Sequence, residues 1–210
     1  MNPASPVFTP TLEPEDQARA DFYALLARLY SAAPDAKLLA AIATGPEVAT
    51  EGHDSRGADF AGAWRALATT SAASVSEQVA DEYQELFVGV GRSEVSLYGS
   101  SYVKGSSGKQ LLVDVREALS QLGLERQADA TMFEDHLAAV FETMRVLITH
   151  GGQQAATLEQ QREFFSNNIE PWIFECCAAI TSKTVANYYA RVAQFTESFM
   201  ALERDAFAME

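Results

Sequence analysis

The stretch ATMFEDHLAAVFETMRVLIT, residues 130–149, has the clearest periodicity in the chain. Its large apolar residues recur at intervals of three and four, so they fall on one face of a helix: Phe133, Leu137, Val140, Phe141, Met144, Leu147 and Ile148. This spacing predicts an amphipathic helix that packs against a core.

The same period of 3.6 residues extends through the chain on both sides of this stretch. It predicts helices over 14–30, 60–70, 75–88, 109–122, 155–165, 171–182 and 185–206, and a shorter helix after Asp35 through Leu38, Leu39 and Ile42. No alternating strand pattern is longer than four residues, and no repeat of fixed period is present. The expected fold is all-α, with a single bundle-like domain of about eight or nine helices over residues 1–210.

Composition excludes several classes of protein. The chain has 210 residues, 48% of them apolar, and a formal net charge of −14. The apolar share is enough for a substantial core, while the acidity argues against a nucleic-acid binder, which needs clustered Lys and Arg. No apolar run is long enough for a membrane span, and the first twelve residues lack the pattern of a secretory signal. A cytoplasmic protein with no stable membrane insertion is therefore expected.

Residues 44–58, which contain three glycines and a proline, are expected to form a loop. Two further segments also fall outside the helical pattern. Residues 1–12 read as a loose N-terminal arm, and residues 89–108 are rich in glycine and serine yet also contain aromatic residues. A loop of that length inside a compact domain is usually functional or disordered, and its apolar content favours a packed, functional loop. Because long linkers permit helix exchange between protomers, a monomer and a domain-swapped dimer both remain open.

Several kinds of chemistry have no support in the sequence. None of the three histidines follows a glutamate by three residues, so the paired Glu-x-x-His motifs of a di-iron bundle are missing. The segment 103–110 has valine where a phosphate loop begins with glycine, and Gln110 replaces the Ser or Thr that would hold magnesium. Cys176 and Cys177 are adjacent in an apolar helix, as expected of buried thiols. We expect no metal and no cofactor.

Three consecutive polar residues, Glu134, Asp135 and His136, stand out at the start of the strongest helix. Acids favour the positive end of a helix, and the histidine could pack or cap there, which is one interpretation. The other is an exposed pair of acid and imidazole that grips a positively charged peptide or performs acid–base work. Position alone leaves both open.

Four stretches together resemble the TorD/DmsD family of redox-enzyme maturation chaperones. They are EYQELFVG at 82–89, SLYGSSY at 96–102, EDHL at 134–137 and EPWI at 170–173, in the family's order and spacing. The likeness covers residues 79–180. The family usually has proline where Val90, Leu97 and Phe133 stand in this chain.

The resemblance implies an all-helical chaperone without catalytic residues that works in the cytoplasm. Its partner would be the precursor of a molybdenum or tungsten oxidoreductase, bound through the twin-arginine signal peptide until the cofactor is inserted. Residue by residue, Tyr83, Leu86 and Phe87 match the apolar helix end beside the family's groove. The loop lining that groove matches Tyr98, Gly99, Ser100 and Tyr102, and the acidic peptide-binding segment matches Glu134, Asp135 and His136.

Two other functions compete with this one. A small hydrolase would use Asp135 and His136 with a nucleophile such as Ser100 or Ser101. An interaction subunit of an acidic helical complex would need no peptide groove. Turnover that is lost in His136→Ala would indicate the enzyme, and indifference to free signal peptide would indicate the subunit.

Overall fold

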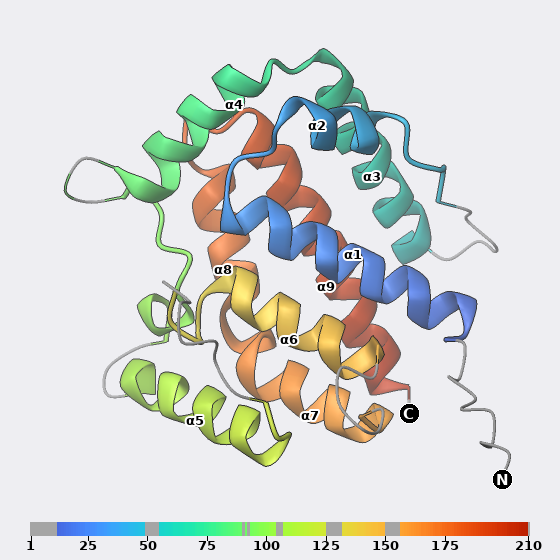
Figure 1. Ribbon diagram of the computed structural model, residues 1–210, viewed down its shortest axis with the longest axis vertical. Helices are drawn as coiled ribbons and strands as arrows, with labels where there is room; N and C mark the ends of the chain where they lie inside the picture. The colour runs from blue at the N-terminus through green and yellow to red at the C-terminus, as the bar shows by residue number, and fades with distance from the viewer. Residues whose placement is uncertain are drawn as a thin grey trace, which may run out of the picture.

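Helices account for 76% of the residues that the computed structural model describes, which are 12–48, 55–89, 91, 93–103, 107–124, 132–149 and 156–209. The described α-helices are α1 (Pro14–Ser31), α2 (Ala36–Ala43), α3 (Ser55–Ala73), α4 (Ser76–Tyr83), α5 (Ser107–Gln121), α6 (Leu137–Thr149), α7 (Leu158–Asn168), α8 (Glu170–Thr181) and α9 (Tyr188–Ala208). A π-helix, η1 (Gln84–Val88), continues α4, and a 3₁₀ turn, η2 (Gly99–Ser101), precedes α5. The prediction of an all-α fold with eight or nine helices is confirmed for this part of the chain (Figure 1).

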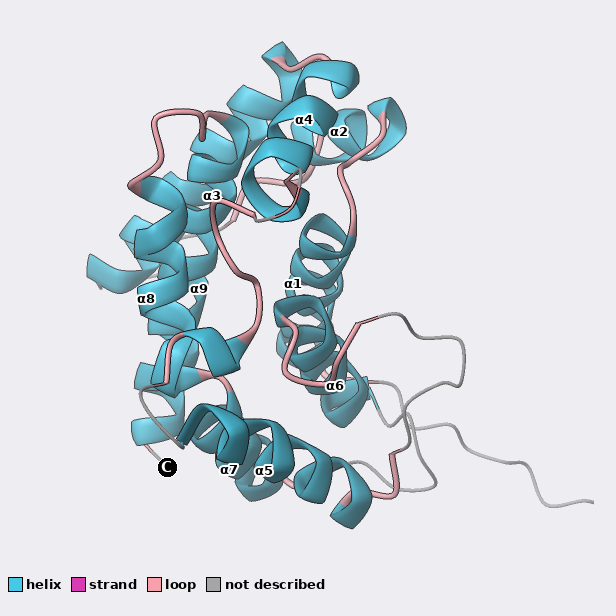
Figure 2. Ribbon diagram, turned by 90° about the vertical axis from the view of Figure 1, so that its left-hand side faces the viewer, coloured by secondary structure: helices cyan, strands magenta, loops and turns pink. Residues whose placement is uncertain are grey.

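The other helices pack around two long helices, α1 and α9. Helix α1 lies along α6, while α9 packs against both α3 and α8. Helices α5 and α7 lie side by side at one end of the molecule, away from α2 and α4 (Figures 1 and 2). No described helix combines the length and the apolar character needed to cross a bilayer.

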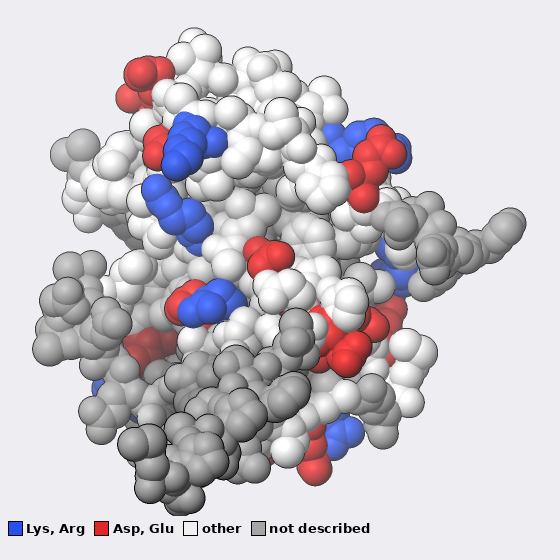
Figure 3. All heavy atoms as spheres, turned by 45° about the vertical axis from the view of Figure 1, so that its right-hand side comes forward, with Lys and Arg blue, Asp and Glu red and all other residues white. Residues whose placement is uncertain are grey.

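The charged side chains that can be seen on one face of the molecule are dispersed. On the face shown in Figure 3, acidic and basic residues stand in small groups separated by wide uncharged areas. On this face the net charge of −14 is therefore not concentrated in one continuous acidic surface.

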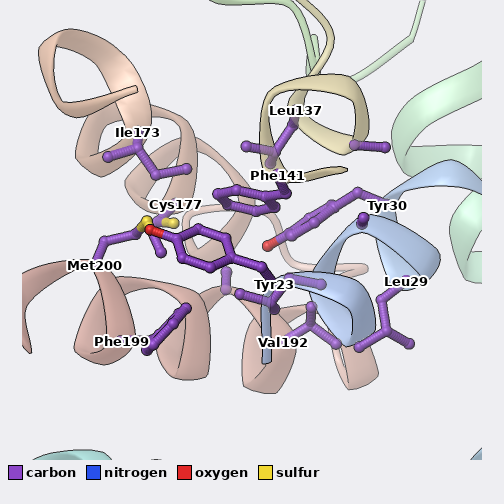
Figure 4. Close-up of a cluster of buried hydrophobic side chains, with 14 of the residues drawn as sticks. Tyr23, Leu29, Tyr30, Leu137, Phe141, Ile173, Cys177, Val192, Phe199 and Met200 are labelled. Atoms are coloured by element: carbon purple, nitrogen blue, oxygen red, sulfur yellow. The ribbon is translucent and has the colours of Figure 1, made fainter. Parts of the chain in front are cut away.

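The core is formed where α1, α6, α8 and α9 meet. Side chains from all four helices interdigitate there, among them Tyr23, Leu29, Tyr30, Leu137, Phe141, Ile173, Cys177, Val192, Phe199 and Met200 (Figure 4). The Tyr30 hydroxyl forms a hydrogen bond with Thr196 Oγ1 at 2.9 Å, so a buried polar atom finds a partner. Burial of this apolar surface is the main stabilising contribution to the fold.

Two carboxylates join distant elements. Glu82 in α4 accepts hydrogen bonds from the backbone N–H groups of Asn187, Tyr188 and Tyr189, at 2.7–3.1 Å. These amides open α9 and have no partner within their own helix, so Glu82 acts as a cap supplied from another helix. Glu203 in α9 is buried and accepts hydrogen bonds from Arg19 and Tyr23, which fixes α1 to α9.

The structure corrects some predicted boundaries. Helix α6 begins at Leu137 and not at residue 130, because residues 133–136 form a turn whose backbone bonds to another segment. Residues 55–58, expected in a loop, belong to α3. The predicted arm lies outside the described residues except for Leu12, and so do residues 90, 92 and 104–106 of the predicted loop.

Candidate functional site

The loop 93–103 and the turn 132–136 meet in the fold, although 28 residues separate them in the sequence. Tyr98 and His136 form an antiparallel bridge. The Gly99 N–H donates to the carbonyl of Asp135 at 3.0 Å, and the Leu137 N–H donates to the carbonyl of Leu97 at 2.8 Å. The resemblance assigns both segments to one groove, which implies that they lie together, and in the structure they do.

Asp135 is buried under the loop and accepts a hydrogen bond from the loop backbone. Its side chain is only 2% exposed, and Oδ2 accepts the Ser100 N–H at 3.0 Å. The expectation of an exposed carboxylate at this position is wrong, because the loop covers the turn. Asp135 positions the loop backbone and is not open to a ligand from outside.

His136 begins α6 as a neutral cap. Its Nδ1 accepts the Ala138 N–H at 3.2 Å, and its ring meets Tyr98 edge-to-face at 4.9 Å. The residue is 6% exposed, and burial lowers its pKa from 6.5 to about 4 against the opposing effect of Asp135. The imidazole is therefore uncharged at neutral pH and does not form the exposed charged pair that its sequence position suggested.

Four of the predicted site residues line one pocket of about 230 Å³. Tyr83 and Phe87 come from α4 and η1, Tyr98 from the loop and His136 from the turn. The remaining lining residues are Ser31, Val88, Ser93, Ser96, Leu97 and Met132. A π-helix is uncommon and often occurs at functional sites, and η1 contributes both Phe87 and Val88 here.

A larger apolar groove of about 610 Å³ adjoins this pocket. It runs between α1, α6 and the end of α5, and it shares Ser31 and Met132 with the pocket. Its other residues are mostly small or apolar: Ala24, Ala27, Arg28, Leu119, Leu124, Glu134, Ala138, Ala139, Glu142, Thr143 and Val146. Phe133, 52% exposed, packs its ring against Tyr98 beside this region.

The other predicted site residues have structural surroundings. Leu86 is fully buried in the core and lines neither cavity. Gly99 is buried where a Cβ atom would come within 2.7 Å of the Trp172 indole. Tyr102 stacks on Trp172 and donates to the Ser96 carbonyl at 2.6 Å. Ser100 is exposed.

The polar groups do not assemble a hydrolytic centre. In the described residues, the hydrogen bond of Asp135 goes to the backbone of Ser100, and the Ser101 hydroxyl pairs with Ser96 at 2.7 Å. No described hydrogen bond joins either serine to His136, so the nucleophile, base and orienting acid of a triad are not connected. Burial raises the pKa of the Cys176 thiol to about 12 and also raises that of Cys177, which makes both thiols unreactive.

Sequence reasoning missed what α1 contributes. Ala24, Ala27, Arg28 and Ser31 line the groove, yet three of them are small, and a single arginine on a helix surface gives no signal of a site. Their only signature is that they lie beside the apolar stripe of the helix.

Comparison with known proteins gave two matches. The family model described as "Nitrate reductase delta subunit" matches residues 53–178, a span that includes η1, the loop and the turn. A "Chaperone protein TorD" from Shewanella pealeana is 26% identical over 211 residues, covering 92% of this chain and 92% of the relative.

Proposed function

The chain belongs to the nitrate reductase delta subunit family, as a non-catalytic redox-enzyme maturation chaperone of the TorD type, and from this membership we propose that it binds a twin-arginine signal peptide. The peptide belongs to the precursor of a molybdenum or tungsten oxidoreductase. The chaperone holds that apo-precursor in the cytoplasm until the cofactor has been inserted.

The observation that carries this proposal is the joining of the pocket to the apolar groove. Tyr83, Phe87, Tyr98 and His136 come from separate segments and line one pocket, which shares two residues with the groove. The pocket is smaller than the roughly 300–1,000 Å³ of typical small-molecule sites, whereas the groove falls within that range. A small pocket beside an apolar groove suits an extended or helical peptide, with one anchoring side chain, better than a cofactor.

The predicted residues take two kinds of role in this proposal. Tyr83, Phe87, Tyr98 and His136 contact the peptide, and the groove between α1 and α6 receives its apolar run. Asp135 acts as a positioning residue, because its bond to Ser100 fixes the loop. Gly99, Tyr102 and Leu86 support this surface from beneath, while Ser100 and Glu134 lie at its edge.

A titration tests the proposal directly. The probe is a synthetic peptide with two adjacent arginines followed by a run of Leu and Ala, titrated by calorimetry into the full chain. Replacing Ala139 by Gln should fill the groove with a longer side chain, and Phe133→Ser should remove an exposed aromatic ring beside Tyr98. We expect each substitution to weaken binding by about tenfold, which corresponds to about 1.4 kcal/mol.

The matched control is Val113→Ser, which removes an exposed apolar side chain of α5 that lines neither cavity. It should bind as the unmodified chain does. A peptide that fails to bind the unmodified chain would contradict the proposal and favour an interaction subunit. Equal losses in all three variants would show that the groove has no special part in binding.

A further inference from the structure

An arginine pair needs carboxylates that are accessible, and those beside the apolar groove are engaged elsewhere. Asp135 is buried against the loop, Glu134 pairs with Arg116 at 3.1 Å, and Glu142 pairs with Arg145 at 2.6 Å. The acceptors for guanidinium groups are therefore to be sought on another face.

A second groove, of about 370 Å³, lies between α5 and α7, which run side by side in Figures 1 and 2. One wall carries Asp114 and Glu117 of α5, and the other carries Glu163 of α7. Phe164 and Asn168 are buried residues at its base. No lysine or arginine is among the described residues that line it.

Asn168 supplies an observation that is independent of these acids. Its side chain is 3% exposed, and Nδ2 donates to the Phe164 carbonyl at 3.1 Å. Its Oδ1 is buried and has no hydrogen-bond partner in the structure. A buried acceptor without a donor is costly, so this oxygen favours a ligand that brings an N–H group to the base of the groove.

The charges at the groove favour a cation. Glu117 and Glu163 are exposed, neither is in an ion pair within the described part of the chain, and like charges on facing walls repel. No three His, Cys, Asp or Glu residues of that part are placed to hold a metal ion. A guanidinium group is planar with five N–H donors, so it can serve carboxylates and an amide oxygen together.

We propose that the groove between α5 and α7 binds an arginine side chain of the client peptide, with Glu117, Glu163 and Asn168 Oδ1 as acceptors. The assignment of the arginine to a client peptide rests on the proposed function. The apolar groove and the acidic groove then divide recognition, one taking the apolar run and the other an arginine.

The first experiment uses a probe that does not depend on client binding. Acetyl-Arg-Arg-amide is titrated into the ¹⁵N-labelled full chain, and the side-chain NH₂ signal of Asn168 is followed by NMR. We expect a saturable shift of that signal, and at least a fivefold weaker response to acetyl-Lys-Lys-amide. Absence of a saturable shift with the arginine probe overturns the proposal.

Matched variants then distinguish the effect of the groove residues on binding from the effect of the net charge. Glu117→Gln with Glu163→Gln removes two charges from the groove, and Glu175→Gln with Glu197→Gln removes two exposed charges elsewhere. Asn168→Leu removes the amide without changing charge. We expect the first pair and Asn168→Leu each to weaken diarginine binding at least fivefold, with little change in the second pair.

The readouts also distinguish the two proposals. Asn168→Leu removes the unpartnered Oδ1 together with the Nδ2 hydrogen bond to the Phe164 carbonyl, and these two effects on stability oppose each other. We therefore expect the melting temperature to change little, so that a lost affinity would not reflect unfolding. Diarginine binding without binding of the long peptide contradicts the proposed function and leaves the acidic groove supported. Long-peptide binding that is unchanged in all these variants contradicts the acidic groove alone.

Discussion

His136 shows at the scale of one residue how a candidate acid–base group can serve as structure. Its Nδ1 accepts the Ala138 N–H at the start of α6, and its backbone pairs with Tyr98. The residue is only 6% exposed, and this burial lowers its pKa and keeps the imidazole neutral at pH 7. The sequence suggested a chemical role for His136, but in the structure this residue joins the loop to the start of α6.

Stability should therefore fall in acid because of His136. The unfolded chain binds a proton near pH 6.5 and the folded chain only near pH 4, so between these values the unfolded state holds more protons. The contribution is complete above about pH 6.5 and is lost as the pH falls toward 4. At pH 5 the stability lost in this way should amount to about 2 kcal/mol.

The comparison variant is His136→Asn, whose amide oxygen can accept the same N–H without titrating. Urea unfolding at pH 7 and pH 5 should show a smaller loss of stability in the variant than in the unmodified chain. Identical losses would mean that groups other than His136 account for the acid sensitivity.

Gly99 supports a second prediction at this scale. A Cβ atom there would lie 2.7 Å from both Leu111 and the Trp172 indole, and that indole is held by its bond to the Asn168 carbonyl at 2.8 Å. Gly99→Ala should destabilise the chain by about 1–3 kcal/mol, because a buried ring has to move. Gly62→Ala in α3 is the control, since nothing lies near its added methyl group and alanine favours helices. Chemical denaturation should show opposite signs for the two substitutions.

At the scale of elements, periodicity predicted the helices because each one buries a continuous apolar face. It failed at the start of α6, where Phe133 continues the apolar spacing but lies exposed in a turn. The pattern of side chains cannot show that the backbone there bonds to the loop 97–100. The pattern also could not show the role of Glu82, which belongs to α4 but caps the start of α9.

The role of Glu82 gives a prediction for α9. In Glu82→Gln one acceptor oxygen becomes an NH₂ group that faces backbone donors, so charged capping is lost. The free energy of unfolding should fall by about 1–2 kcal/mol. Urea titration should show this, while Glu197→Gln, on the exposed face of α9, should change stability by less than about 0.5 kcal/mol. Equal effects of the two substitutions would contradict the cap.

At the scale of the molecule, the sequence could predict which segments belong to the site but not what each residue does there. The loop and the turn do meet, and Tyr83, Phe87, Tyr98 and His136 do share a pocket. The burial of Asp135 depends on a loop that folds over it, which no local pattern encodes. The acidic groove between α5 and α7 arises only when two helices far apart in sequence come together.

The net charge of −14 predicts how a basic peptide approaches this molecule. This net charge attracts a basic peptide from a distance but is screened beyond about 10 Å at 0.1 M salt, so it should act mainly on the rate of association. In stopped-flow measurements with the twin-arginine peptide, the association rate constant should fall by roughly tenfold between low and physiological salt. The dissociation rate constant should change much less, because apolar contacts in the groove resist screening. A peptide with serine in place of both arginines serves as the control and should lose most of this salt dependence. If salt instead altered dissociation alone, close ion pairs would govern recognition, and long-range attraction by the whole molecule would have no part in it.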